Sequence, residues 1–170
     1  MLNWFIDRQF TKAERDLGVP LDYARWIARV SLPATMRMAK FTKLLNAHRG
    51  PKTAFHVASL VGSMAEDCGS CVQIGVNLAR KAGVSREILE AVVRRTPEVL
   101  PEELADVYHF AEATTLNASE LDDYRERIRR HYGDDGLVEI ALAVAMHRVF
   151  PTLKRGLGFA KSCSLVPVEV

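Results

Sequence analysis

The residues of this 170-residue chain best suited to chemistry form the tetrapeptide Cys68-Gly-Ser-Cys71. Two intervening residues let both sulfur atoms meet within one helical turn, so a disulfide can form and break with little backbone rearrangement. If the tetrapeptide opens a helix, the partial positive charge of the helix N-terminus stabilises a thiolate over a thiol. The pattern therefore favours redox or nucleophilic cysteine chemistry. A second interpretation, in which both cysteines are small buried hydrophobic residues, fits the same spacing.

A metal site fits the sequence less well than a redox pair. Zinc sites use a second Cys-x-x-Cys pair or two histidines at finger spacing, and neither follows this pair. The remaining cysteine of the chain, Cys163, lies in the tail sequence KSCSLV, far from the pair. We therefore predict no metal and no organic cofactor, and we interpret Cys163 as a residue without a redox role.

Length and composition limit the other classes of function. One domain is expected, because domains of about 150 residues are typical, and a chain of this size needs no disulfide staples. The net charge of +2 gives no argument for a nucleic-acid partner. The longest uncharged apolar stretch, residues 140–146, is too short to span a membrane, and the first residues lack the pattern of a secretory signal. We therefore expect a cytoplasmic protein with no membrane partner.

The remaining pattern is that of an all-α protein. Good helix formers dominate, and breaks are predicted at glycine and proline, including Gly18 and Gly133. A helix over residues 53–64 leads into the turn before the cysteines. The next helix is predicted to run from residue 68 to residue 82 and to end at Gly83. Asp67 is predicted to cap that helix, because a carboxylate there accepts the free backbone N–H groups of the first turn.

The string HVASLVGSMAEDCGSCVQIGVNLARKAGVSREILEAVV resembles the AhpD-like family, which includes alkylhydroperoxidases and carboxymuconolactone decarboxylases. The likeness lies in a helix, a Cys-x-x-Cys pair that opens a second helix, a KAGVS-type turn and an amphipathic helix. It implies an AhpD-like helical domain over residues 41–160, preceded by a helical arm over 1–40 and followed by a tail over 161–170. The family forms trimers and hexamers, so the resemblance also implies a homo-oligomer. An arm that carries Trp4, Phe5 and Trp26 is suited to a subunit interface.

The resemblance also implies roles for both cysteines. In the redox members of the family the second cysteine attacks a peroxide and the first resolves it, which assigns attack to Cys71 and resolution to Cys68. These members relay protons through a glutamate twelve residues before the first cysteine and a histidine four residues after the second. This chain departs from the pattern at both places, which hold His56 and Gly75.

Two residues are candidates to replace the missing proton relay. If residues 53–64 and 68–82 form an antiparallel hairpin, His56 and Gly75 lie at the same depth, and His56 is expected to fill the space beside Gly75. His56 would then act as a base or as the partner of a thiolate, and a core histidine bonded to backbone is the alternative. Glu66, just before the pair, is the second candidate to move a proton, and Asp67 beside it could also do so but is interpreted as the helix cap.

These observations lead to two functional hypotheses. In the first, the protein is a thiol–disulfide oxidoreductase or alkylhydroperoxidase-like antioxidant enzyme. It acts on a peroxide or disulfide through Cys68 and Cys71, and an external dithiol reduces the pair again. In the second, it is a non-catalytic or differently active member of the carboxymuconolactone decarboxylase family that binds a small ligand or serves as an oligomeric scaffold. The helix start by itself favours Cys68 as nucleophile, whereas the resemblance favours Cys71.

Overall fold

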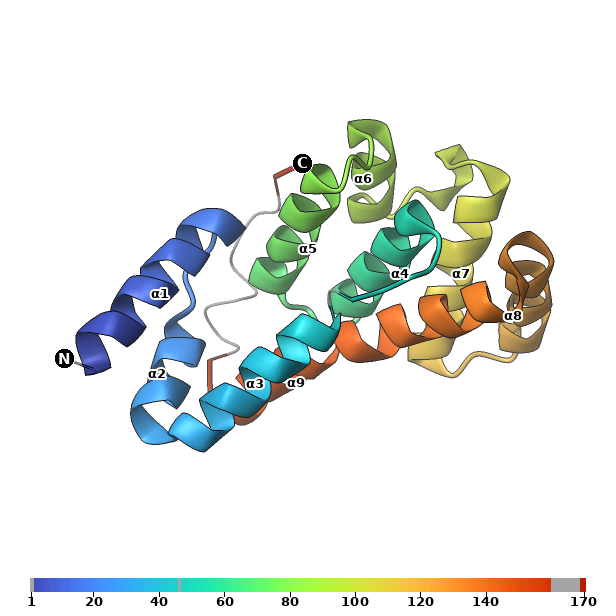
Figure 1. The fold of residues 1–170 in the computed structure, drawn as a ribbon. Coiled ribbons are helices and arrows are strands. Elements are labelled where there is room, and N and C mark those ends of the chain that lie inside the picture. The colour runs from blue at the N-terminus through green and yellow to red at the C-terminus, as the bar shows by residue number, and fades with distance from the viewer. Residues whose placement is uncertain (1, 46, 160–168) are drawn as a thin grey trace.

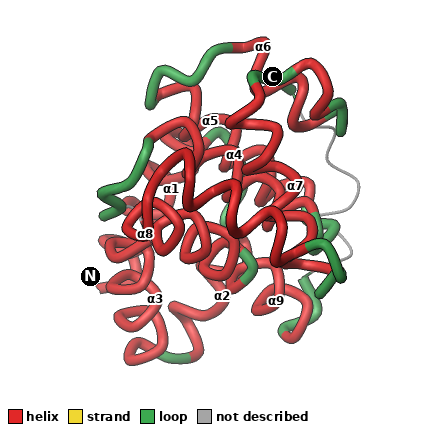
Figure 2. The backbone as a smooth tube through the Cα atoms, turned by 90° about the vertical axis from the view of Figure 1, so that its right-hand side faces the viewer, coloured by secondary structure: helices red, strands yellow, loops and turns green. Residues whose placement is uncertain are grey.

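The computed structural model describes residues 2–45, 47–159 and 169–170, and the side chains from residue 7 onward within these ranges. In this part of the chain the protein is all-α, as predicted, and it contains no strand (Figures 1 and 2). Cys163 and the side chains of Trp4 and Phe5 lie outside it. The helices are α1 (Leu2–Leu17), α2 (Asp22–Val30), α3 (Leu32–Leu45), α4 (Lys52–Met64), α5 (Gly69–Lys81), α6 (Arg86–Val93), α7 (Glu102–Leu116), α8 (Leu121–His147) and α9 (Val149–Gly156), with a short 3-10 helix, η1 (Pro97–Val99), before α7.

Helix α4 is the centre of the main hydrophobic core. Its apolar residues occupy nearly every side of the helix, a pattern that predicts burial all round. It packs against α5, α7 and α8 (Figure 1), and Val57, Ala58 and Leu60 are almost fully buried there. This packing fixes the C-terminal end of α4, from which the chain turns into the cysteine pair.

Helix α8 changes direction at Gly133, where the sequence predicts a break. The backbone of Gly133 lies outside the helical region, with φ 69° and ψ −179°. A positive φ costs glycine little because it has no Cβ. The first part of α8 consequently stands at a steep angle to the second part (Figure 1). The second part carries Ile140 and Val144 into the core.

One helical stretch, Leu121–Gly156, contains a window of mean hydropathy 1.4 that is long and apolar enough to cross a membrane by length and composition alone. Only 28% of that window is buried inside the protein. The stretch includes the bend at Gly133, and it contributes Ile140, Ala143 and Val144 to the core. Because a core helix of a globular protein passes the same test, this is weak evidence, and the expected absence of a membrane span stays a prediction.

The N-terminal helices form a second core together with the last helix. Its buried members are Val19, Leu21, Tyr23, Ala24 and Ile27. They pack against partly buried apolar side chains of α1, α3, α5 and α9. Arg25 of α2 binds Glu14 of α1 at 2.7 Å, and the Asn77 side chain of α5 donates a hydrogen bond to the Leu17 carbonyl oxygen. The predicted arm is therefore packed against the rest of the chain, and its part in an oligomer stays a prediction.

Gly62 marks a close approach of α4 to α8, and its replacement gives a first testable prediction. A Cβ at Gly62 would lie 2.8 Å from the Val144 carbonyl oxygen. Alanine normally stabilises a helix by about 0.5–1 kcal/mol relative to glycine, but overpacking against a backbone that cannot swing away costs about 1–3 kcal/mol. We expect Gly62→Ala to lower the free energy of unfolding by about 1–2 kcal/mol in chemical denaturation.

The matched control for this prediction is Gly156→Ala in α9. No atom lies within 4 Å of a Cβ at Gly156, so this change is expected to leave the stability unchanged or to raise it slightly. Equal free energies of unfolding for the Gly62 and Gly156 variants would contradict the close approach of α4 and α8.

Candidate redox site

The turn between α4 and α5 brings the cysteine pair to a helix N-terminus. Helix α5 begins at Gly69, and Cys68 is its N-cap residue. The prediction that Asp67 caps this helix is wrong, because Asp67 lies one residue too early and adopts a left-handed φ of 50° in the turn. Asp tolerates that conformation better than most residues. Both sulfurs nevertheless lie at the positive end of the α5 dipole, as the sequence predicts.

The two cysteines themselves form the predicted pair. Their Sγ atoms lie at disulfide-bonding distance, and their Cα atoms are 5.3 Å apart, within the normal range for a disulfide. Both residues are buried, with exposed fractions of 4% for Cys68 and 9% for Cys71. The pair is therefore shielded from bulk solvent over most of its surface.

Lys154 on α9 lies beside the sulfurs, and the sequence pattern does not predict this position. Its Nζ lies 3.4 Å from the Cys71 Sγ and 3.9 Å from the Cys68 Sγ. It also donates a hydrogen bond of 2.9 Å to the Ser70 Oγ. Lys154 is only 3% exposed, and a buried ammonium group is costly unless polar or anionic partners surround it. The site thus holds the lysine amine against both sulfurs and the Ser70 hydroxyl.

An aromatic ring from the N-terminal part of the chain completes the surroundings of Lys154. The Nζ lies 4.7 Å from the centre of the Tyr23 ring on α2, a distance at which the ring face attracts a cation. Tyr23 is itself buried. The predicted N-terminal arm therefore contributes a wall of the site, although the family resemblance begins only after it.

The sequence carries a weak signal for Lys154. Phe150, Lys154 and Leu157 follow one another at helical spacing along α9 and the residue after it. A lysine in the middle of an apolar stripe is unusual, because lysine is rarely buried. The same lysine is also typical of the last turn of an exposed helix, where a cation complements the helix dipole. Its partner sulfurs could not be predicted from this pattern.

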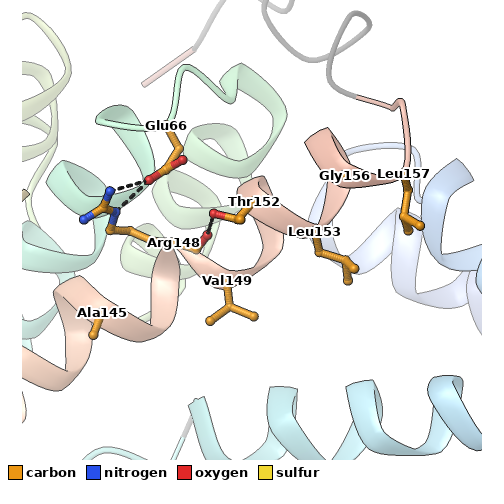
Figure 3. A pocket seen from close by; sticks show the side chains of 8 residues that line it. All are labelled: Glu66, Ala145, Arg148, Val149, Thr152, Leu153, Gly156 and Leu157. Carbon is orange, nitrogen blue, oxygen red and sulfur yellow. Dashed lines mark hydrogen bonds and ion pairs between the residues drawn. The ribbon is translucent and has the colours of Figure 1, made fainter.

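Glu66, a predicted proton carrier, is held in ion pairs away from this cluster. Its carboxylate binds Arg148 at 2.7 Å (Figure 3), and it also pairs with Arg155. Burial raises the pKa of Glu66, but the hydrogen bonds from Arg148 and Arg155 outweigh burial and leave the pKa below its usual value. These contacts give no support to proton transfer by Glu66. They do fix Arg155, and with it the neighbouring Lys154, against the turn that holds the cysteines.

His56, the other predicted relay residue, lies in a cluster of rings. Its ring centre is 5.9 Å from that of His48 and 5.6 Å from that of Phe55. A Cβ at Gly75 would meet the Leu60 Cδ2 at 2.8 Å, so Leu60, and not His56, fills the space beside Gly75. Burial, followed by the nearby charges of the neighbouring histidines, lowers the pKa of His56 to about 4. The structure therefore places Lys154 beside the sulfurs. It places His56 among other rings.

Two cavities lie near these groups, and they differ in their relation to the cysteines. One, of about 840 Å³, runs along α8 and α9 and has Glu66 and Arg148 at its edge (Figure 3). The other, of about 360 Å³, opens beside Cys68. Its lining consists of the polar residues Asp67, Cys68 and Arg95, the apolar residues Met64, Val72 and Val93, and Gly69. Cys68, and not Cys71, lines this second cavity.

Among the described residues, no group of three or more His, Cys, Asp or Glu side chains is placed to hold a metal ion. Compared with family models, with curated proteins and with solved structures, the chain has no match.

Proposed function

We propose that this protein is a thiol–disulfide oxidoreductase in which Cys68 and Cys71 cycle between a dithiol and a disulfide. The observation that carries the proposal is the buried Lys154 ammonium group, 3.4 Å from one sulfur and 3.9 Å from the other. In surroundings of low polarity, a positive charge at this distance favours a thiolate over a thiol. The thiolate is the species that attacks a disulfide and the species that leaves when a disulfide is broken.

The sequence separation of the pair supports a redox role over a structural one. Cys68 and Cys71 are three positions apart, and in the chain-entropy account a disulfide that closes so short a loop constrains the unfolded chain least. The cation beside the pair adds a desolvation cost that a purely structural disulfide does not need. Both features fit a site in which reduction and oxidation are the task.

We include the AhpD-like fold in this proposal. The hairpin of α4 and α5, with the cysteines at the start of α5, supports it. The family relay positions hold His56 and Gly75, so in this proposal Lys154 stabilises the thiolate that the family relay would otherwise serve. A peroxide or a disulfide is the oxidant, and an external dithiol is the reductant.

The proposal is tested by treating the reduced full chain with a small disulfide in one arm and with an alkyl hydroperoxide in another. We expect the disulfide to oxidise the pair at least about tenfold faster than it oxidises free cysteine at the same pH. The readouts are the loss of two titratable thiols and the matching mass change. Cys163→Ser, which removes the cysteine outside the pair, is expected to keep this reaction, and Cys71→Ser is expected to stop at a mixed disulfide.

The two arms separate the hypotheses. Rapid oxidation by the hydroperoxide would extend the activity to the peroxidase reaction that the family resemblance implies. Reaction with the disulfide alone would limit the activity to thiol–disulfide exchange. A pair that reacts with neither oxidant faster than free cysteine would contradict the proposal and favour a ligand-binding or scaffold protein with inert cysteines.

A further inference from the structure

We infer that substrates reach the pair at Cys68, and that the substrate is a small thiol carrying both an amino group and a carboxylate, or the disulfide of such a thiol. This inference rests on the proposed function and concerns the same site. The cavity of about 360 Å³ carries it, because Cys68 lines that cavity together with one acidic residue, Asp67, and one basic residue, Arg95.

The size and apolar lining of the cavity favour a small organic molecule. Its volume lies at the lower end of the range of small-molecule sites. Met64, Val72 and Val93 supply apolar surface against which the methylene group beside a substrate sulfur can pack. These side chains come from the end of α4, the first turn of α5 and the end of α6, so three helices line this open cavity.

The charges at the cavity are of opposite sign and are available to a ligand. Asp67 and Arg95 both have exposed side chains, and neither forms an ion pair with another described residue. A guanidinium group binds a carboxylate through two parallel hydrogen bonds, and a carboxylate binds a protonated amine. Asp67 repels a purely anionic thiol and Arg95 repels a purely cationic one, so the pair of charges favours a molecule that carries both groups.

The positions of the two sulfurs determine which one the substrate attacks and which one leaves. In the oxidised protein, a substrate thiolate attacks the Cys68 Sγ and forms a mixed disulfide. The Cys68–Cys71 bond breaks, and its electron pair leaves with the Cys71 Sγ. That atom is the sulfur nearer to the Lys154 Nζ, at 3.4 Å, so the leaving thiolate forms beside the cation.

A second substrate thiolate completes the cycle. It attacks the substrate sulfur of the mixed disulfide, forms the substrate disulfide and releases Cys68 as a thiolate. Two substrate thiols lose two electrons and two protons in total, and the protein disulfide gains two electrons. The protons pass to the two protein thiolates or to solvent. The reverse sequence reduces a substrate disulfide.

The test measures how fast four thiols reduce the oxidised full chain, with each rate expressed per thiolate. The thiols are cysteine, cysteamine without the carboxylate, N-acetylcysteine without the charged amine, and 2-mercaptoethanol without either group. We expect cysteine to react about threefold faster than each singly charged thiol, the size of effect that one exposed ion pair produces. In Arg95→Gln the ratio of the cysteine rate to the cysteamine rate is expected to fall to about one. In Asp67→Asn the ratio of the cysteine rate to the N-acetylcysteine rate is likewise expected to fall to about one.

The control variant is Arg94→Gln, which removes a positive charge from the same turn. The Arg94 side chain is exposed and pairs with Glu90, and Arg94 does not line the cavity. Both rate ratios are expected to keep their wild-type values in this variant. A fall of the cysteine-to-cysteamine ratio in Arg94→Gln as large as that in Arg95→Gln would overturn the assignment of Arg95.

A trapping experiment tests the order of the cysteines. Cystine is added to reduced Cys71→Ser and to reduced Cys68→Ser, and the mixed disulfides are measured by mass spectrometry. We expect the adduct on Cys68 to form at least about threefold faster than the adduct on Cys71. Faster labelling of Cys71 would overturn the inference that substrates enter at Cys68.

These outcomes separate the inference from the proposed function. If all four thiols reduce the pair at equal rates per thiolate, and faster than they reduce a small linear disulfide, the substrate assignment is overturned and the proposed function stands. If no thiol reduces the pair faster than it reduces the linear disulfide, the proposed function fails, and the substrate assignment fails with it.

Discussion

Replacing Lys154 by methionine is expected to slow the reduction of the oxidised Cys68–Cys71 pair by small thiols about tenfold. In the proposed reaction the Cys71 sulfur leaves 3.4 Å from the Lys154 Nζ, which the proposal treats as an ammonium group. Without that charge, the Cys71 thiolate loses its stabilising partner and forms less readily. A thiol that ionises less readily is a poorer leaving group, so the exchange slows.

Methionine is the appropriate replacement because it is unbranched and apolar, and it keeps much of the volume of the lysine side chain. Removing a buried ammonium group also removes its desolvation cost, so the variant is expected to be at least as stable as the native protein. This separates a chemical effect from a folding defect. The control is Lys52→Met on the exposed surface of α4, which is expected to leave the rate of reduction unchanged. Equal rates for the native protein and Lys154→Met would contradict the role of Lys154.

The second large effect is a loss of stability as the pH falls from about 6.5 to 4. Burial lowers the pKa of both His56 and His147 to about 4 in the folded protein, whereas the unfolded chain keeps a value of about 6.5. The unfolded chain therefore binds protons at a higher pH than the folded chain does. The stability is complete above the unfolded pKa and is lost as the pH falls through this window.

We expect the free energy of unfolding to fall on the order of 2 kcal/mol by pH 4.5 through His147, and by a smaller amount through the more exposed His56. Electrostatic interactions with His48, His147 and Lys52 also lower the pKa of His56 and so add to this effect. Urea denaturation at a series of pH values measures the profile. His147→Phe keeps a ring against Phe55, whose ring centre lies 5.6 Å from that of His147, and it is expected to flatten the profile. Equal slopes for the two proteins would show that His147 is not responsible.

The hairpin that carries the cysteines could be predicted because its signals are local. The predicted helix over residues 68–82 differs by one residue at each end from α5, Gly69–Lys81, and apolar periodicity with Gly83 suffices for that agreement. The N-cap residue of α5 could not be predicted in the same way. Asp67 and Cys68 are adjacent, and the left-handed backbone of Asp67 is decided by how the turn closes over the core.

The residues that surround the sulfurs could not be predicted because they come together only in the folded chain. Lys154 is 83 positions from Cys71, and Tyr23 belongs to a different part of the sequence again. Helical spacing placed His56 and Gly75 at similar depth. It could not show that Leu60 would meet Gly75, because that depends on the rotation and crossing angle of α4 against α5. Tertiary packing, and not periodicity, decides these contacts.

The measurement that tests the redox assignment most directly is a titration of the full chain against thiol–disulfide buffers of known potential. A midpoint between roughly −270 and −120 mV, the range of dithiol oxidoreductases, is the predicted result. In the proposal Lys154 stabilises the reduced, thiolate form, so Lys154→Met is predicted to shift the midpoint to a lower potential. A midpoint below roughly −300 mV that does not respond to Lys154→Met would mark a structural disulfide and contradict the redox assignment of Cys68 and Cys71.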